Sequence, residues 1–116
     1  MALTTDIWAV TPSFSATLYR AAAAIAGAGD ITLITNQPLD NGAGYQILFT
    51  CAGDATAATF TITGYVAGDL SQSVTTETVA GVDSGTATST NYYSRITSIS
   101  SDAAVATNVS IGNAIA

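Results

Sequence analysis

The side chains that most enzymes use for catalysis are scarce in this sequence of 116 residues. Histidine is absent, so Ser-His-Asp triads, Cys-His pairs and histidine-based zinc sites cannot be built. Glu77 is the single glutamate, and a glycosidase would need it to face an aspartate, or two aspartates to face each other, across a cleft. The aspartates fall almost entirely in predicted turns, where Asp is a common turn former. We therefore expect a protein that is not an enzyme.

The sequence predicts no metal or cofactor site. Residues 40–42 (Asp-Asn-Gly) resemble part of a calcium loop, but the alternating carboxylates and the closing glutamate are missing. Gly27 and Gly29 are not followed by the third glycine or the Gly-Lys-Ser/Thr of a phosphate-binding loop. Cys51 is the single cysteine, which excludes an intrachain disulfide. Because it lies in an apolar run, we expect a buried thiol.

Tyrosine, tryptophan, phenylalanine and arginine remain as candidate contact residues, and Tyr, Trp and Arg in particular carry binding energy where proteins meet. In an extended strand Tyr92 and Tyr93 point to opposite faces, and Arg95 shares the face of Tyr93. Tyr93 and Arg95 therefore form a candidate protein-binding pair. An alternative stays open, in which Arg95 pairs with a local carboxylate such as Glu77. Arg20 is a further candidate interface residue.

Charged residues make up 9% of the chain, against roughly a quarter in typical soluble domains. Serine, threonine, alanine and glycine take their place, and these short side chains lose little rotamer entropy when they are covered. This composition fits an ordinary Thr/Ser-rich β-sandwich or a chain that is covered by neighbours, and we favour the second. The formal net charge of −6 would repel a phosphate backbone, so we expect no nucleic-acid partner.

Residues 1–17 show neither helical nor strand periodicity and are predicted to form an extended arm. Trp8 and Phe14 in this arm are candidate plugs for pockets on this subunit or on a neighbouring one. Residues 18–116 are predicted to form one β-sandwich domain. The chain has no apolar run long enough to span a bilayer and no cationic leader at its start, so we expect neither a membrane anchor nor secretion.

Short segments of alternating apolar and polar residues, separated by Gly, Asn and Asp, predict an all-β domain. Residues 16–26 favour a strand over an alanine-rich helix because they run into a Gly-Ala-Gly-Asp turn. No amphipathic helix pattern follows, so we expect an antiparallel sandwich of the jelly-roll or immunoglobulin-like type. The core should come from the faces that contain Tyr45, Phe49, Phe60 and Val109. Further strands are predicted over residues 30–36, 45–51, 59–66, 70–79, 86–99 and 105–111, with a bend inside 86–99 as an alternative.

Five segments in order resemble a virion protein family of tailed bacteriophages. They are residues 27–33 (GAGDITL), 59–64 (TFTITG), 77–81 (ETVAG), 85–93 (GTATSTNYY) and 96–100 (ITSIS), and the resemblance covers about residues 20–112. The sequence departs from the family pattern at residues 64–69, where an Asp/Asn-Gly hairpin is more common. It also has Asn91 where lysine is common.

The resemblance implies a β-sandwich subunit of the phage particle, most similar to capsid decoration or cement proteins. Such proteins bind the outer surface of the major capsid protein lattice, form trimers or other homo-oligomers and stabilise the head. The expected location is therefore the capsid surface of a virion made in the host cytoplasm. The alternative is a structural or adaptor protein of the tail, neck or a fibre.

Overall fold

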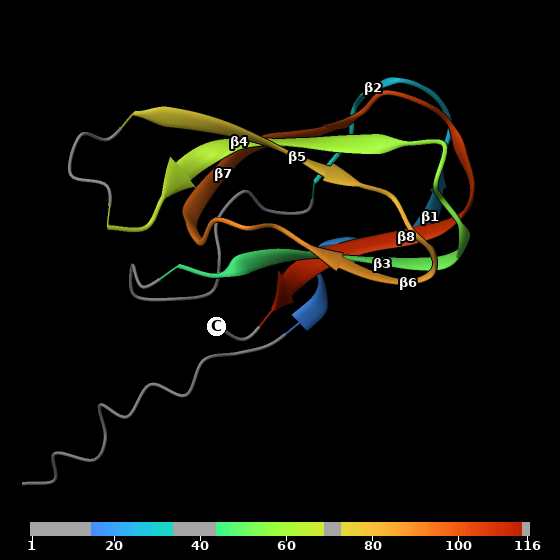
Figure 1. Ribbon diagram of the computed structural model, residues 1–116, viewed down its shortest axis with the longest axis horizontal. Helices are drawn as coiled ribbons and strands as arrows, with labels where there is room; N and C mark the ends of the chain where they lie inside the picture. Colours follow the sequence, from blue (N-terminus) through green and yellow to red (C-terminus); the bar gives the residue numbers. More distant parts are fainter. Residues whose placement is uncertain (1–14, 34–43, 69–72, 115–116) are drawn as a thin grey trace, which may run out of the picture.

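The computed structural model describes residues 15–33, 44–68 and 73–114, which form eight β-strands (Figure 1). None of these residues belongs to a helix that could cross a membrane. The strands in chain order are β1 (Ser15–Ile25), β2 (Gly29–Asp30), β3 (Gln46–Asp54), β4 (Thr59–Val66), β5 (Val74–Ala80), β6 (Asp83–Thr88), β7 (Tyr93–Ser101) and β8 (Val105–Ala114).

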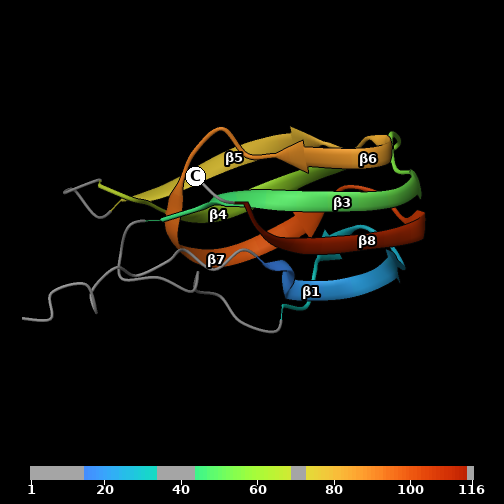
Figure 2. The ribbon, with the colours of Figure 1, turned by 90° about the horizontal axis from the view of Figure 1, so that it is seen from below.

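The strands pair like one long hairpin that has been rolled up. Strand β4 pairs with β5, β3 with β6, β2 with β7 and β1 with β8, always antiparallel. Rolling places β8 beside β3 and β7 beside β4, which gives two sheets with the orders β1-β8-β3-β6 and β2-β7-β4-β5. The sheets lie face to face (Figures 1 and 2). This is the jelly-roll arrangement, so the all-β sandwich is confirmed and its immunoglobulin-like variant is wrong.

The predicted strands agree with the structure in position more than in length. Strand β4 has the expected bounds, and the alanine-rich stretch at 16–26 is a strand, as expected. The segment predicted at 86–99 is two strands in different sheets, because the chain crosses from β6 to β7 at residues 89–92. Strand β6 also begins at Asp83, inside a predicted loop, where it pairs with Asp54. Strand β1 begins at Ser15, before the predicted end of the arm.

The core lies between the two sheets and contains the predicted faces. Phe49 from β3 and Phe60 from β4 stack with ring centroids 4.6 Å apart and planes 6° apart, so each sheet contributes one ring to the centre. Both are fully buried, and Cys51 is buried beside them, as expected for its thiol. Further buried residues of the expected faces are Tyr45, Ile47, Ile62, Val105, Val109 and Ile111.

Strand β7 carries two β-bulges that change which of its side chains enter the core. Ile99, Ile96 and Tyr93 are all fully buried although they are three residues apart, a spacing that a regular strand cannot bury on one face. The pairing with β4 shifts between Thr63 and Gly64, and again between Tyr65 and Val66. Each shift adds one unpaired residue to β7: Thr97 at the first shift and Ser94 at the second. After each of them the alternation starts again, so that Ile96 and then Tyr93 point into the core.

The bulges overturn the expectation that Tyr93 and Arg95 share a face. Tyr93 lies opposite the inward-facing Val66, whereas Arg95 lies opposite Tyr65 and is exposed. With Ser94 inserted between two paired positions, residues two apart in the sequence point to opposite sides of the sheet. The bulged backbone also presses on Gly64, where a Cβ atom would overlap the carbonyl oxygen of Arg95. Glycine is therefore required there for close approach rather than for an unusual φ angle.

We expect Gly64→Ala to lower the free energy of unfolding by about 1–3 kcal/mol, since the added methyl group must displace the bulged backbone of β7. Gly27→Ala is the matched control, because a Cβ atom there meets nothing within 4 Å. The control should change stability by less than about 0.5 kcal/mol. Urea denaturation of both variants measures the difference, and equal effects would contradict this account of the β4–β7 contact.

Candidate protein-binding face

The outer face of the sheet β2-β7-β4-β5, the side that points away from the core, is the main candidate for a binding surface. Its middle consists of two cross-strand rows of small hydroxyl side chains, here called the hydroxyl rows. They follow from the alternation in β4, where the residues between buried Phe60, Ile62 and Gly64 point outward. The first row is Thr76, Thr63 and Ser98, and the second is Thr78, Thr61 and Ser100.

One end of this face is large and positively charged. Tyr65 lies directly opposite Val74 of β5 on one side and Arg95 of β7 on the other, so the three side chains form one row. The Arg95 guanidinium lies 5.8 Å from the centre of the Tyr65 ring, within range of a cation–π contact. Val74 is 53% exposed and adds an apolar side chain to this row. Tyrosine and arginine are enriched at protein contacts.

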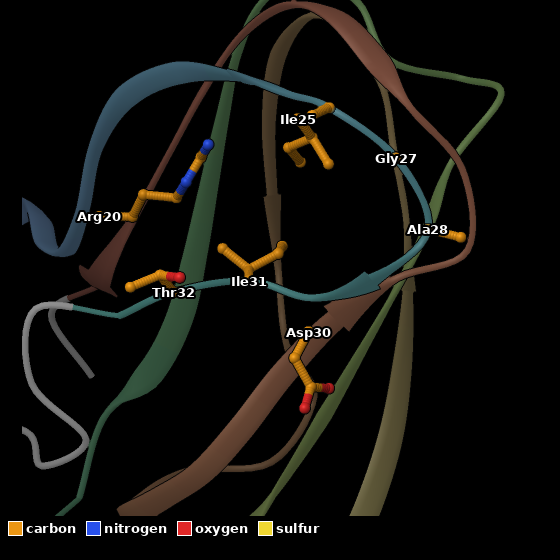
Figure 3. A pocket seen from close by; sticks show the side chains of 8 residues that line it. Arg20, Ile25, Gly27, Ala28, Asp30, Ile31 and Thr32 are labelled. Atoms are coloured by element: carbon orange, nitrogen blue, oxygen red, sulfur yellow. The ribbon is translucent and has the colours of Figure 1, made fainter.

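The opposite end of the face is small and negatively charged. Asp30 of β2 pairs with Ser100 and therefore extends the second hydroxyl row to the edge of the sheet. Its neighbour Ile31 is buried, so the alternation directs the Asp30 carboxylate outward. Figure 3 shows Asp30 pointing away from Ile31 and Thr32. Asp102 follows β7 at the same end, where its carboxylate accepts a 2.7 Å hydrogen bond from the backbone N–H of Thr59.

Arg20 takes part in the fold. Its Nη1 donates 2.8 Å hydrogen bonds to the carbonyl oxygens of Ala23 and Val109, and Nη2 donates one of 2.8 Å to that of Ala24. The bond to Val109 joins β1 to β8 where the register between the two strands is irregular, and the other two bonds lie within β1. Burial lowers the pKa of the guanidinium below its ordinary value. The interface role predicted for Arg20 stays a prediction, while its three carbonyl contacts give it a structural one.

A pocket of about 330 Å³ lies beside Arg20, inside the arc of chain that runs from Ile25 through Gly27 to Thr32 (Figure 3). Arg20 reaches into it from β1, but its donors are engaged by backbone carbonyls. Asp30 points out of it. Among the described residues no group of three or more His, Cys, Asp or Glu side chains could hold a metal ion. We therefore find no converging set of charged groups in this pocket.

Glu77 fastens the connection between β6 and β7 to the edge strand β5. It lies opposite buried Ile62 and so faces the interior side of the sheet. Its carboxylate accepts hydrogen bonds from the backbone N–H groups of Thr90 and Asn91 and from the Tyr93 hydroxyl, the last at 2.8 Å. Arg95 is on the other side of the sheet, so the alternative of an Arg95–Glu77 pair is wrong.

The other predicted contact residues are divided between the interior and the part of the chain that is not described. Tyr93 is fully buried, so its side chain is not available at the surface of this subunit. Trp8 and Phe14 lie outside the described residues, and their role stays a prediction. Tyr65, Val74 and Asp30 were missed by sequence reasoning. The alternation of residues 59–66 places Tyr65 outward with the threonines, which is the signal that could have found it.

Comparison with known protein families, with curated proteins and with solved structures finds no match.

Ionisation of Tyr93 makes the stability of the fold depend on pH in the alkaline range. Burial, with the Glu77 carboxylate beside the hydroxyl, raises the pKa of Tyr93 to about 12. An unfolded tyrosine ionises near pH 10, so the unfolded chain loses this proton first. The difference between the two pKa values contributes to the free energy of unfolding. This contribution is complete below pH 10 and is lost as the pH rises from about 10 to about 12.

We expect the free energy of unfolding of the wild type to fall more steeply than that of Tyr93→Phe in this window, by up to about 1.4 kcal/mol per pH unit. Tyr92→Phe is the matched control, because the neighbouring Tyr92 side chain is 40% exposed, and it should follow the wild type. Denaturation curves from pH 9 to pH 12 measure the slopes. The same slope for Tyr93→Phe and wild type would show that Tyr93 is not buried as described.

Proposed function

We propose that this chain is a capsid decoration protein of a tailed phage, which binds the outer surface of the major capsid protein lattice and stabilises the head. The observation that carries the proposal is the outer face of β2-β7-β4-β5, with two uncharged hydroxyl rows between one apolar and cationic end and one acidic end. Threonine and serine lose little rotamer entropy on burial, so such a face is well suited to lying against another protein.

The fold and the phage-like motifs add support of a different kind. Jelly rolls recur in viral capsid and lectin domains, although a fold alone does not determine a function. Four of the motifs fall on β4, the end of β5, β6 with the start of β7, and the middle of β7. They include the stacked Phe60 and the Glu77–Tyr93 contact. The resemblance therefore includes residues that build the sandwich. The proposed capsid contact would use the exposed side chains of the outer face instead.

The decisive experiment is to count this chain in purified particles of the phage that encodes it. Trypsin is unsuitable, because the chain has two arginines and no lysine. Cleavage before aspartate yields suitable peptides, such as residues 54–68 and 83–101, which can be quantified against isotope-labelled standards. The major capsid protein in the same digest supplies the reference.

A decoration protein on a symmetric lattice should be present at about one copy per capsid subunit, or at about one third of that if each three-fold site binds one chain. About one copy per hundred capsid subunits would instead favour the tail or neck adaptor. Absence from intact particles would contradict both virion proposals. Removing the chain should also lower the temperature at which heads release DNA if it stabilises the lattice.

A further inference from the structure

The outer face of β2-β7-β4-β5 is complementary to itself in size and in charge. Tyr65, Val74 and Arg95 make one end large and positive. Asp30 and Asp102, beside the small second hydroxyl row, make the other end negative. The ends of this face differ in side-chain size and in charge. When a second copy is turned end for end, the large side chains of one copy therefore lie over the small side chains of the other, and the cation lies over the carboxylate.

Arg95 and Asp30 do not meet within one copy. They lie on the neighbouring strands β7 and β2, but Arg95 is level with Tyr65 and Asp30 is level with Thr61. Four residues along β4 separate these two levels, which corresponds to about 13 Å. The described contact of Arg95 is with the Tyr65 ring, and the Arg95 side chain is exposed. Among the described residues of this face, each copy therefore presents the exposed cation of Arg95 at one end and the exposed carboxylate of Asp30, with Asp102 nearby, at the other.

We propose that two copies of this chain form a two-fold dimer through this face. The axis lies in the plane of the face, crosses the strands at right angles and passes through Thr63, the midpoint between Tyr65 and Thr61. Tyr65 then lies over Thr61 of the second copy, and Val74 lies over its Thr78. Arg95 faces Ser100 and Asp30 of the second copy, and the two-fold axis repeats every contact.

The hydroxyl rows form the centre of this dimer. Threonine methyl groups supply apolar contact and their hydroxyl groups supply donors and acceptors, so neither surface buries an unmatched charge at the centre. Three strands about 4.8 Å apart with seven residues each at about 3.3 Å, together with the two residues of β2, give a footprint of about 360 Å² per copy. A standard interface buries about 800 Å² per partner, which is more than this footprint. We therefore expect a weak dimer with a dissociation constant in the micromolar range.

The inference concerns the free protein, in which a second copy covers the face that the capsid proposal assigns to the major capsid protein. Its failure would leave the copy number in particles untouched, and absence from particles would leave the dimer untouched. If the capsid proposal holds, a weak dimer can dissociate and leave this face to the capsid lattice, because binding to the lattice shifts the equilibrium by mass action.

Sedimentation velocity of the full chain over about 1–500 µM tests the dimer, a range chosen to bracket micromolar dissociation. Three variants alter the charges that should meet: Arg95→Asp, Asp30→Arg, and both changes together. Each single change places like charges together twice across the axis, whereas the double change restores two opposite pairs in reversed order. Asp83→Arg, on exposed β6 in the other sheet, is the control for the charge change of Asp30→Arg.

We expect a concentration-dependent dimer for the wild type and for Asp83→Arg, and a dissociation constant raised at least about tenfold in Arg95→Asp and in Asp30→Arg. The double variant should return to within about threefold of the wild type. Circular dichroism of each variant checks that the sandwich is retained. A wild type that stays monomeric to the highest concentration, or an oligomer that the single variants leave unchanged, would overturn the inference, as would a double variant that remains monomeric.

Discussion

The pairing of β4 with β7 is the constraint on which the rest of this structure depends. Two extra residues in β7 allow Tyr93, Ile96 and Ile99 to enter the core at intervals of three, and Gly64 leaves room for the backbone that the bulge pushes inward. Without the first bulge, at Thr97, Arg95 would pair with Val66 and occupy the interior side, where a lone guanidinium would carry a large desolvation cost. The bulges thus direct the apolar side chains of β7 into the core and Arg95 onto the outer face.

The same constraint connects the two parts of the molecule that carry polar chemistry. Tyr93 points inward and donates to Glu77, which also holds the backbone of the β6–β7 connection. Arg95 points outward, lies over Tyr65 and gives the outer face its positive end. Three charged side chains have definite places in the described part of the chain: Glu77 holds the β6–β7 connection, Arg20 donates to Val109 of β8, and Arg95 lies on the outer face.

Alternation of apolar residues was sufficient to predict the all-β class, the position of most strands and the core face around Phe49 and Phe60. It failed where the period changes, because a bulge adds a residue without adding a recognisable turn sequence. Ile96 and Ile99, three residues apart inside a segment that reads as a strand, were the visible sign of the first bulge. Partners across the sheet, such as Asp30 beside Ser100, depend on the topology and had no local signal.

The pattern of backbone proton contacts between β4 and β7, measured by NMR on the free protein, tests the bulged pairing most directly. The structure predicts cross-strand contacts that link Thr63 to Ser98, Gly64 to Ile96, Tyr65 to Arg95 and Val66 to Tyr93. A regular antiparallel ladder that starts from the same Thr63–Ser98 pair would instead link Tyr65 to Ile96 and Val66 to Arg95. Observation of that regular ladder would place Arg95 inside and contradict both the core and the outer face described for this protein.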